Sequence, residues 1–168
     1  MSGRDFGSVN RFLVGAIGEP GKRTFYIFIE SEGVPSWFKF EKGQAAALGE
    51  QGLELLSNLG WTIDEDEVEG LVSDIDELPP PSGPEEVILR VRSIAMRIDS
   101  RERMTVMLEG DGQEERVVFA ITAEQLRAAA ILSLRAVHSG RAQCPDCLLP
   151  EDPEGHQCPS SNGHRLPG

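Results

Sequence analysis

A long acidic stretch that ends in a run of prolines divides this chain and limits what it can fold into. Its carboxylates, with no Lys or Arg among them between residues 62 and 89, are Asp64, Glu65, Asp66, Glu67, Glu69, Asp74, Asp76, Glu77, Glu85 and Glu86. The stretch closes with Leu78-Pro-Pro-Pro-Ser-Gly-Pro84, which suits neither a helix nor a central strand. We predict a mobile linker over residues 62–84, with a short helical piece around residues 68–72.

The segment before this linker has the pattern of three strands followed by a helix. Residues 11–17, 24–30 and 36–40 are rich in β-branched and aromatic residues, which are typical of strands. Residues 42–59 place Ala and Leu side chains on one face at helical spacing, and Gly60 follows where a helix would end. We therefore predict a βββα unit.

The segment after the linker repeats this order. The apolar residues of the run 87–98 change from odd to even positions, which predicts a long strand with a β-bulge near Arg92–Ser93. Alternating apolar residues at 104–108 and 117–121 predict a hairpin that turns at Gly110–Gly112. A helical pattern follows, so the second half also has the order βββα.

The two strand-to-helix junctions match at several offsets. Phe38-Lys-Phe-Glu-Lys-Gly-Gln44 corresponds to Phe119-Ala-Ile-Thr-Ala-Glu-Gln125, with an aromatic residue, a cap and a Gln at the same offsets. Thr122 and Gln125 form a capping box, and the helix that they open is predicted to stop at Gly140. We predict an α+β fold in which two βββα-like halves form an antiparallel sheet covered by two helices. One matched junction leaves open whether the halves are a true duplication, because other strand-to-helix junctions share this pattern.

The predicted organisation has four parts. They are a first βββα half (residues 1–61), an acidic, proline-rich linker (62–86), a second βββα half (87–140) and a small C-terminal zinc-binding segment (141–168). A chain of 168 residues suits one domain with a small appendage.

The charge of the chain limits the partners that it can bind. A net charge of -12 repels phosphate backbones and anionic membrane surfaces, so bulk nucleic-acid binding and membrane docking are disfavoured. The sequence has neither the run of about eighteen apolar residues that a membrane-spanning helix needs nor a signal-peptide pattern. We therefore expect a cytoplasmic protein.

All 3 cysteines lie near the end of the chain, together with two of its histidines. The cluster consists of Cys144-Pro-Asp-Cys147, His156-Gln-Cys158 and His164. A spacing of two residues lets a tight turn aim both thiolates at one ion, and four such ligands close a tetrahedral zinc site. The segment has too few apolar residues to fold by burial, so a metal would hold it together. His156 and His164 are alternatives for the fourth ligand.

We predict that this Zn²⁺ is structural. Three thiolates leave the ion a poor activator of water, and three-Cys sites are usually closed. An odd number of clustered cysteines fits a metal in a reducing cytosol better than a disulfide framework. No Ser-His-Asp arrangement can be built, because His138, His156 and His164 all lie at or beside the C-terminal segment. We therefore do not expect an enzyme.

A glycine-rich turn and a basic strip are the remaining candidate sites. Residues 15–23 lack the spacing of a phosphate-binding loop and are predicted to form a plain turn. Lys22 and Arg23 of this turn are candidates to bind an anion or an acidic partner. The basic strip around the last helix and the tail consists of Arg127, Arg135, His138, Arg141 and Arg165. Such a strip either docks nucleic acid or pairs with the protein's own acidic linker.

Several motifs resemble those of a known family. They are Gly18-Glu-Pro-Gly-Lys-Arg-Thr-Phe25, Glu41-Lys-Gly-Gln44, Cys144-Pro-Asp-Cys147 and Asp152-Pro-Glu-Gly-His156-Gln-Cys158-Pro-Ser-Ser-Asn-Gly163. With them the chain resembles, over nearly its whole length, the bacterial family of conserved hypothetical proteins called domain of unknown function three-thousand-and-ninety. Members typically have Tyr where this chain has His164, and Gly where it has Leu148. The resemblance therefore implies Cys144, Cys147, His156 and Cys158 as the zinc ligands, and it implies no activity.

The sequence leads to three hypotheses about function. The preferred one is a cytosolic, zinc-binding, non-enzymatic adaptor that docks a protein partner, because no catalytic constellation is visible and the surface is acidic. The first alternative is an enzyme that acts on an anionic small molecule between the two halves, with Lys22, Arg23 and Glu41. The second alternative is nucleic-acid binding through the zinc segment.

Overall fold

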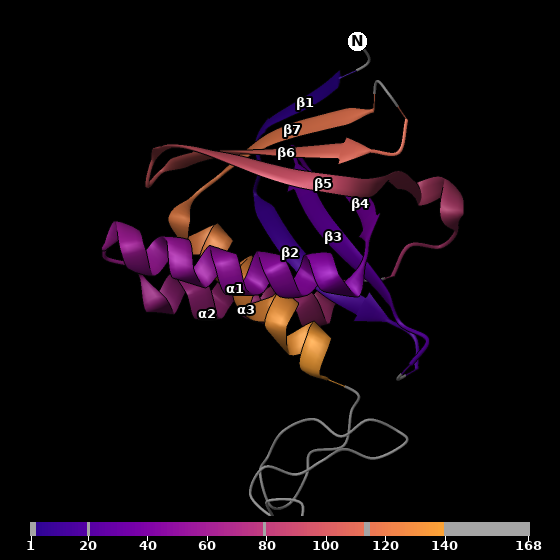
Figure 1. The fold of residues 1–168 in the computed structure, drawn as a ribbon, viewed down its shortest axis with the longest axis horizontal. Coiled ribbons are helices and arrows are strands. Elements are labelled where there is room, and N and C mark those ends of the chain that lie inside the picture. The colour runs from indigo at the N-terminus through magenta and orange to yellow at the C-terminus, as the bar shows by residue number, and fades with distance from the viewer. Residues whose placement is uncertain (1–2, 20, 79, 113–114, 140–168) are drawn as a thin grey trace, which may run out of the picture.

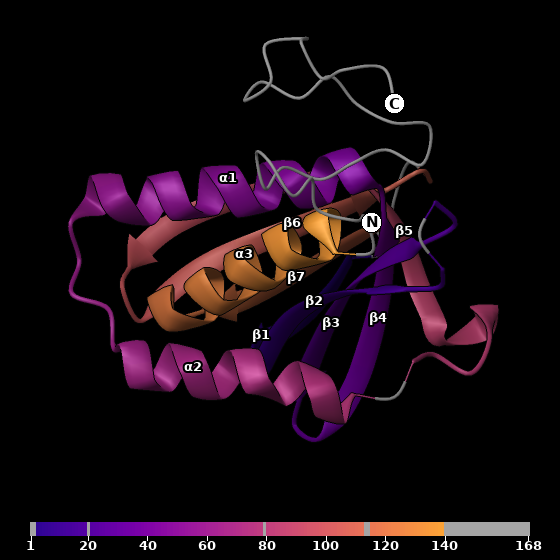
Figure 2. The same cartoon turned by 90° about the horizontal axis from the view of Figure 1, so that it is seen from below.

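One seven-stranded sheet and a row of helices make up the described part of the protein (Figure 1). The computed structural model describes residues 3–19, 21–78, 80–112 and 115–139. The elements are β1 (Gly3–Ser8), β2 (Arg11–Ile17), β3 (Thr24–Ser31), β4 (Val34–Phe40), α1 (Lys42–Leu59), α2 (Glu65–Ser73), the 3₁₀ turns η1 (Asp74–Glu77) and η2 (Pro84–Glu86), β5 (Val87–Ser100), β6 (Arg103–Gly110), β7 (Arg116–Ile121) and α3 (Ala123–His138). Helix α3 lies between α1 and α2 and packs against both (Figure 2). The predicted α+β class is confirmed.

The sheet is mixed rather than purely antiparallel. Its strand order is β1-β7-β6-β5-β4-β3-β2. Strands β2, β3 and β4 form one antiparallel group, and β5, β6 and β7 form another. The two groups join through a parallel pair of β4 with β5, and β1 adds to β7 as a second parallel pair. We predicted neither β1 nor the two parallel pairs.

Many local predictions agree closely with the structure. Helix α1 spans Lys42–Leu59, as predicted, and ends at Gly60, whose φ of 65° is left-handed. The register of β5 shifts between Val91 and Ser93, at the predicted bulge. The capping box of Thr122 opens α3, which ends at His138. The predicted stop at Gly140 lies outside the described residues.

The sheet is strongly curved, because the two residues between β1 and β2 bond to strands near its two ends. The backbone N–H of Val9, which follows β1, donates to Ala120 of β7 at 3.0 Å. The next backbone N–H, that of Asn10, donates to Glu30 of β3 at 2.7 Å. Two consecutive residues therefore bond to strands that lie far apart in the strand order, and the sheet becomes a strongly curved half-barrel.

A side-chain amide joins the start of α1 to the bulge of β5. The Gln44 oxygen accepts from the N–H of Glu41 at 2.7 Å, which completes the capping box. The Gln44 nitrogen donates to the carbonyls of Val91 and Arg92 at 3.1 and 3.0 Å. The residue that begins the helix therefore also satisfies carbonyls of the neighbouring parallel strand where that strand bends.

Gln125 does the same at the start of α3. Its oxygen accepts from the N–H of Thr122 at 2.8 Å, and its nitrogen donates to the Val9 carbonyl at 2.9 Å. Val9 lies at the bend between β1 and β2, so the pair β1–β2 corresponds to the single bulged strand β5. These matched contacts support the repeat of two βββα halves, whose boundaries stay a prediction.

The acidic stretch forms helical structure that packs on the domain. Helix α2 begins at its cap Asp64, is longer than the short piece that we predicted, and buries Val68. Glu65 pairs with Arg127 of α3 at 3.1 Å, which is the pairing with the acidic linker that we considered for the basic strip. Ile75 of η1 packs over β2, where a Cβ on Gly15 would lie 3.3 Å from its Cδ1 atom.

Close packing of α1 on α3 predicts opposite effects for two Gly→Ala substitutions. A Cβ on Gly49 would lie 2.5 Å from Cγ of Leu134, whereas a Cβ on Gly70 of α2 would meet nothing within 4 Å. We expect Gly70→Ala to stabilise the protein by about 0.5–1 kcal/mol through helix propensity. We expect Gly49→Ala to destabilise it by about 1–2 kcal/mol, because overpacking outweighs the same gain. Urea unfolding measures both, and equal stabilisation by both would contradict the close contact of α1 with α3.

Candidate functional site

The predicted zinc ligands lie outside the described residues. These are Cys144, Cys147, His156 and Cys158, with His164 as the alternative ligand. Among the described residues, no group of three or more His, Cys, Asp or Glu side chains is placed to hold a metal ion. The zinc site therefore stays a prediction from the sequence.

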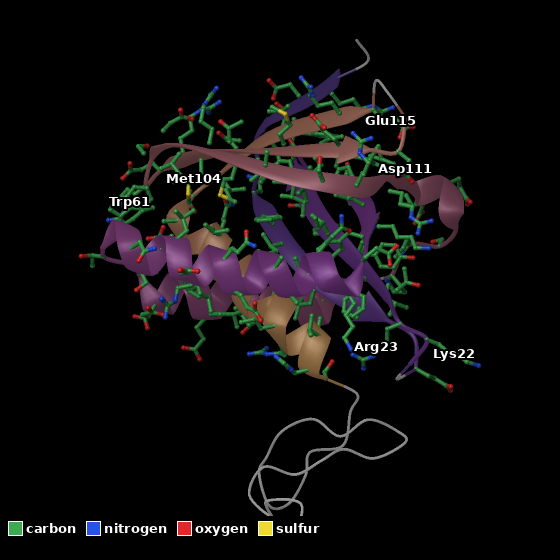
Figure 3. All side chains as sticks on the ribbon, in the orientation of Figure 1. Lys22, Arg23, Trp61, Met104, Asp111 and Glu115 are labelled. Carbon is green, nitrogen blue, oxygen red and sulfur yellow. The ribbon has the colours of Figure 1, made fainter. Side chains whose placement is uncertain are left out.

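Lys22 lies on the turn between β2 and β3. Its backbone N–H donates to the Glu19 carbonyl at 2.9 Å, the bond that closes a four-residue turn. Its side chain is exposed and projects away from the domain (Figure 3).

Arg23 points instead toward the end of α3 (Figure 3). Its guanidinium donates from Nη1 to the Ala136 carbonyl at 3.4 Å and to the Ser139 hydroxyl. Glu41 lies elsewhere, at the start of α1, and pairs with Arg90 at 2.7 Å. The structure therefore gives Lys22, Arg23 and Glu41 separate surroundings, and Arg23 completes the last turn of a helix.

A groove runs between α1 and the second part of β5. Strand β4 pairs with β5 only as far as Arg90, so beyond the bulge β5 has β6 as its one strand partner within the described ranges. A cavity of about 300 Å³ lies beside this free edge. Residues that line it include Leu48, Leu55, Arg92, Ser93, Ile94 and Met96.

A comparison of the two halves explains the groove. The corresponding position is covered by a helix in one half and left open in the other. The matched junctions relate Val14 of β2 to Met96 of β5, and Phe12 to Ile94. The register supports this relation, since Val14 lies across from Ile27 and then Phe38, and Met96 lies across from Val106 and then Phe119. Phe12 and Val14 are each 1% exposed, whereas Ile94 and Met96 are only half-buried. Helix α3 packs directly on β2, but α1 stands off from β5.

The strand beside the groove is basic on a chain whose net charge is -12. Arg92 lies 3.7 Å from Glu109, and Arg116 lies 3.2 Å from the same carboxylate, so two cations share one anion. The hydrogen bond from Arg97, supported by one from Thr105, holds the pKa of Asp99 below its usual value despite some desolvation. The hydrogen bond to Glu41 raises the pKa of Arg90. Arg90 and Arg97 are each paired with one carboxylate, whereas Arg92 and Arg116 share one, so the surplus positive charge beside the groove lies at Arg92 and Arg116.

Two further cavities lie beside the sheet. One, of about 400 Å³, adjoins β2 and the end of α3 and includes Arg135 of the predicted basic strip. The other, of about 580 Å³, lies near the start of β5, where Asp111 and Glu115 are among its lining residues (Figure 3). Lys22 and Arg23 line none of these three cavities. Arg141 and Arg165 of the strip lie outside the described residues.

The sequence held one signal for the groove that we did not use. The bulge of β5 was predicted, and a bulge frequently ends pairing with a neighbouring strand. The apolar residues after it, Ile94, Met96 and Ile98, were therefore candidates for a strand edge that lacks a second partner. What the sequence did not contain was the distance between α1 and that edge.

Comparisons with known proteins give a family and nothing finer. A family model described as Protein of unknown function (DUF3090) matches residues 4–158. No curated protein and no solved structure gives a significant match to the chain. Within the described residues, no helix is both long enough and apolar enough to span a membrane.

The position of Arg23 predicts a structural rather than a ligand-binding role. We expect Arg23→Gln to lower the free energy of unfolding by about 0.5–1 kcal/mol, because the end of α3 loses a cation and a hydrogen-bond donor. The neighbouring change Lys22→Gln should stay within about 0.5 kcal/mol of the wild type. Urea unfolding at one ionic strength compares the two. Equal effects would mean that Arg23 does not support α3.

Proposed function

Because this chain belongs to the DUF3090 family of proteins of unknown function, its activity has to be inferred from its sites, and we propose that it is a cytosolic, non-enzymatic protein-interaction module. The observation that carries the proposal is the open apolar groove between α1 and the free edge of β5. A strand edge beside an apolar groove is a common docking surface for an extended segment of a partner.

The partner's backbone and its side chains would bind to different parts of this site. The partner's backbone pairs with the N–H and C=O groups of β5 that β6 does not use, and this pairing supplies affinity. Its apolar side chains enter the groove and cover Leu48, Leu55 and Met96, and this fit supplies specificity. Burying these side chains contributes roughly 25 cal/mol per Å² of apolar surface removed from water.

A segment of this chain that packs on β2 indicates which residue types the partner segment would have. At the outer strand β2, the acidic and apolar segment Asp74–Glu77 packs on the sheet, with Ile75 over Gly15. Asp74 of this segment lies 3.7 Å from Arg11 of β2. Around the β5 groove, Arg92 and its neighbours carry local positive charge. We therefore expect a partner segment with apolar residues flanked by carboxylates.

The zinc site forms the second part of the proposal. Cys144, Cys147, His156 and Cys158 are the preferred ligands of one structural Zn²⁺, with His164 as the alternative to His156. Thiolate and imidazole are the donors that zinc prefers, and the spacing of the first two suits a tight turn. The ion would fold a segment that has little apolar surface to bury.

Photo-crosslinking tests the groove. Ile98, near the end of β5, is 38% exposed. Val34, on the hairpin between β3 and β4, is 59% exposed and serves as the control position. A photoreactive residue at position 98, expressed in the native cell, should yield a discrete crosslinked protein, because the docked segment lies there. The same residue at position 34 should not yield it. The substitution Met96→Glu should abolish the product, since a buried unpaired carboxylate would fill the groove.

A second measurement distinguishes strand pairing from contact with α1 alone. On binding of the captured partner, hydrogen exchange should slow at the backbone amides of residues 94–98. Absence of crosslinking from position 98, or equal crosslinking from position 34, would contradict a docking role for the groove. Protection of α1 without protection of β5 would contradict strand pairing.

Metal analysis tests the zinc site. Protein purified without added metal should contain about one zinc per chain, because the sequence supplies one ligand set. Cys144→Ser should release the metal without changing the unfolding midpoint of the main domain. His156→Gln should also release it, whereas His164→Gln and the control Ser160→Ala should keep it. If His156→Gln kept the zinc and His164→Gln lost it, His164 rather than His156 would be the fourth ligand. Global unfolding of Cys144→Ser would show that the tail is integral to the core.

A further inference from the structure

A separate cavity adjoins the outer strand β2, away from the groove of β5. It has a volume of about 400 Å³, which lies within the range of sites for small ligands. Its walls come from β2, β3, β4, the end of α3 and the residues Ile75, Leu78 and Pro80. Aromatic and aliphatic side chains form most of them, including Tyr26, Trp37, Ile75, Leu78 and Leu132.

The register explains why there is space at this point. Gly15 lies directly across from Tyr26, so the two share a face of the sheet, and the glycine contributes no side chain to that face. Tyr26 meets Trp37 edge to face, with ring centroids 5.9 Å apart and an interplanar angle of 83°. Ile75 packs over Gly15 on that same face, since a Cβ on Gly15 would lie 3.3 Å from its Cδ1 atom. An aromatic wall, a glycine floor and an aliphatic cover therefore line an apolar cavity that is partly open to solvent.

One end of this cavity is polar and positively charged. Arg135 is the one charged residue among those that line the cavity, and Ser139 lies at the same end. No carboxylate of the described residues lies within 4 Å of the Arg135 guanidinium. Arg23, bound to Ser139, adds a second cation nearby. The two guanidiniums outweigh the partial negative charge at the end of α3.

We propose that this cavity binds a small apolar molecule that carries one carboxylate. The apolar body lies between Trp37 and Leu132, and the carboxylate accepts two parallel hydrogen bonds from Arg135, the geometry that a guanidinium favours. A single carboxylate fits better than a phosphate group, because one lining cation faces the ligand and the chain has a net charge of -12. This site is independent of the proposed docking groove.

Binding would also affect the acidic stretch. Ile75 and Leu78 belong to the segment that we first predicted to be a linker, and both line the cavity. The ion pairs that hold this region, Arg11–Asp74 at 3.7 Å and Arg127–Glu65 at 3.1 Å, involve partly exposed side chains. Such surface pairs hold a segment weakly. A ligand that contacts Ile75 and Leu78 therefore fixes the segment more firmly, and hydrogen exchange at residues 75–78 slows.

Titration of the full chain with matched ligands tests the proposal. The probes are octanoate, decanoate and 4-phenylbutanoate, each compared with its neutral amide, and octyl phosphate as the rival anion. Calorimetry gives affinities, and the fluorescence of Trp37 in a Trp61→Phe background reports on the site. We expect at least one carboxylate to bind at least tenfold more tightly than its amide and than octyl phosphate, and to slow exchange at residues 75–78.

Three variants separate the contribution of the Arg135 charge to binding from that of the apolar cavity. Arg135→Gln should weaken carboxylate binding at least tenfold and leave amide binding unchanged, whereas Arg97→Gln, on the distant strand β5, should change neither. Ala16→Leu should abolish binding of both by filling the cavity, and circular dichroism confirms that each variant is folded. No binding by any carboxylate at millimolar concentration, equal affinity for acid and amide, or full affinity in Arg135→Gln would overturn the proposal. Preference for octyl phosphate would overturn the choice of carboxylate.

Discussion

The fold depends on one interaction that occurs twice, a glutamine amide that starts a helix and ties it to a bent strand. Gln44 and Gln125 each complete a capping box and donate to a backbone carbonyl at the bend of a neighbouring strand. A carbonyl at a bend has lost its ladder partner, so leaving it unsatisfied would cost about 1–3 kcal/mol. The amide satisfies that carbonyl and fixes where the helix begins. The position of each helix over the sheet follows from this contact.

The two halves share this contact but differ in what lies over the next strand. In the first half, α3 packs on β2 and Val14 is 1% exposed. In the second half, α1 packs on α3 through Gly49 and Gly52 and leaves Met96 half-buried. The two glycines let α1 approach α3 closely, because a Cβ at position 49 would clash with Leu134. The open groove of β5 is therefore a consequence of where α1 finds its packing partner.

Local patterns predicted local structure well and distant contacts poorly. Both ends of α1 were predicted correctly, because a capping box and a C-terminal glycine are short-range signals. Strand β1 was missed, since Gly3–Ser8 has little apolar alternation and is held by pairing with β7, more than a hundred residues away. The contact of Arg23 with the end of α3 was missed for the same reason. Nothing near Arg23 in the sequence reveals that it reaches Ala136, 113 residues later.

The acidic stretch gives the clearest physical contrast between strand β2 and the part of β5 beyond its bulge. Its residues cover a face of β2 with Ile75 and meet Arg11 with Asp74, so the chain itself supplies a segment that packs on β2. The described residues supply no equivalent segment for β5. Met96 and Arg92 could nevertheless offer such a segment the same two kinds of contact, apolar packing and an ion pair with a carboxylate. An exposed edge with an apolar groove invites non-specific pairing unless something binds it or charge protects it. Arg92 and Arg116 share one carboxylate, so the surplus positive charge beside β5 favours an acidic partner over a second copy of the same strand.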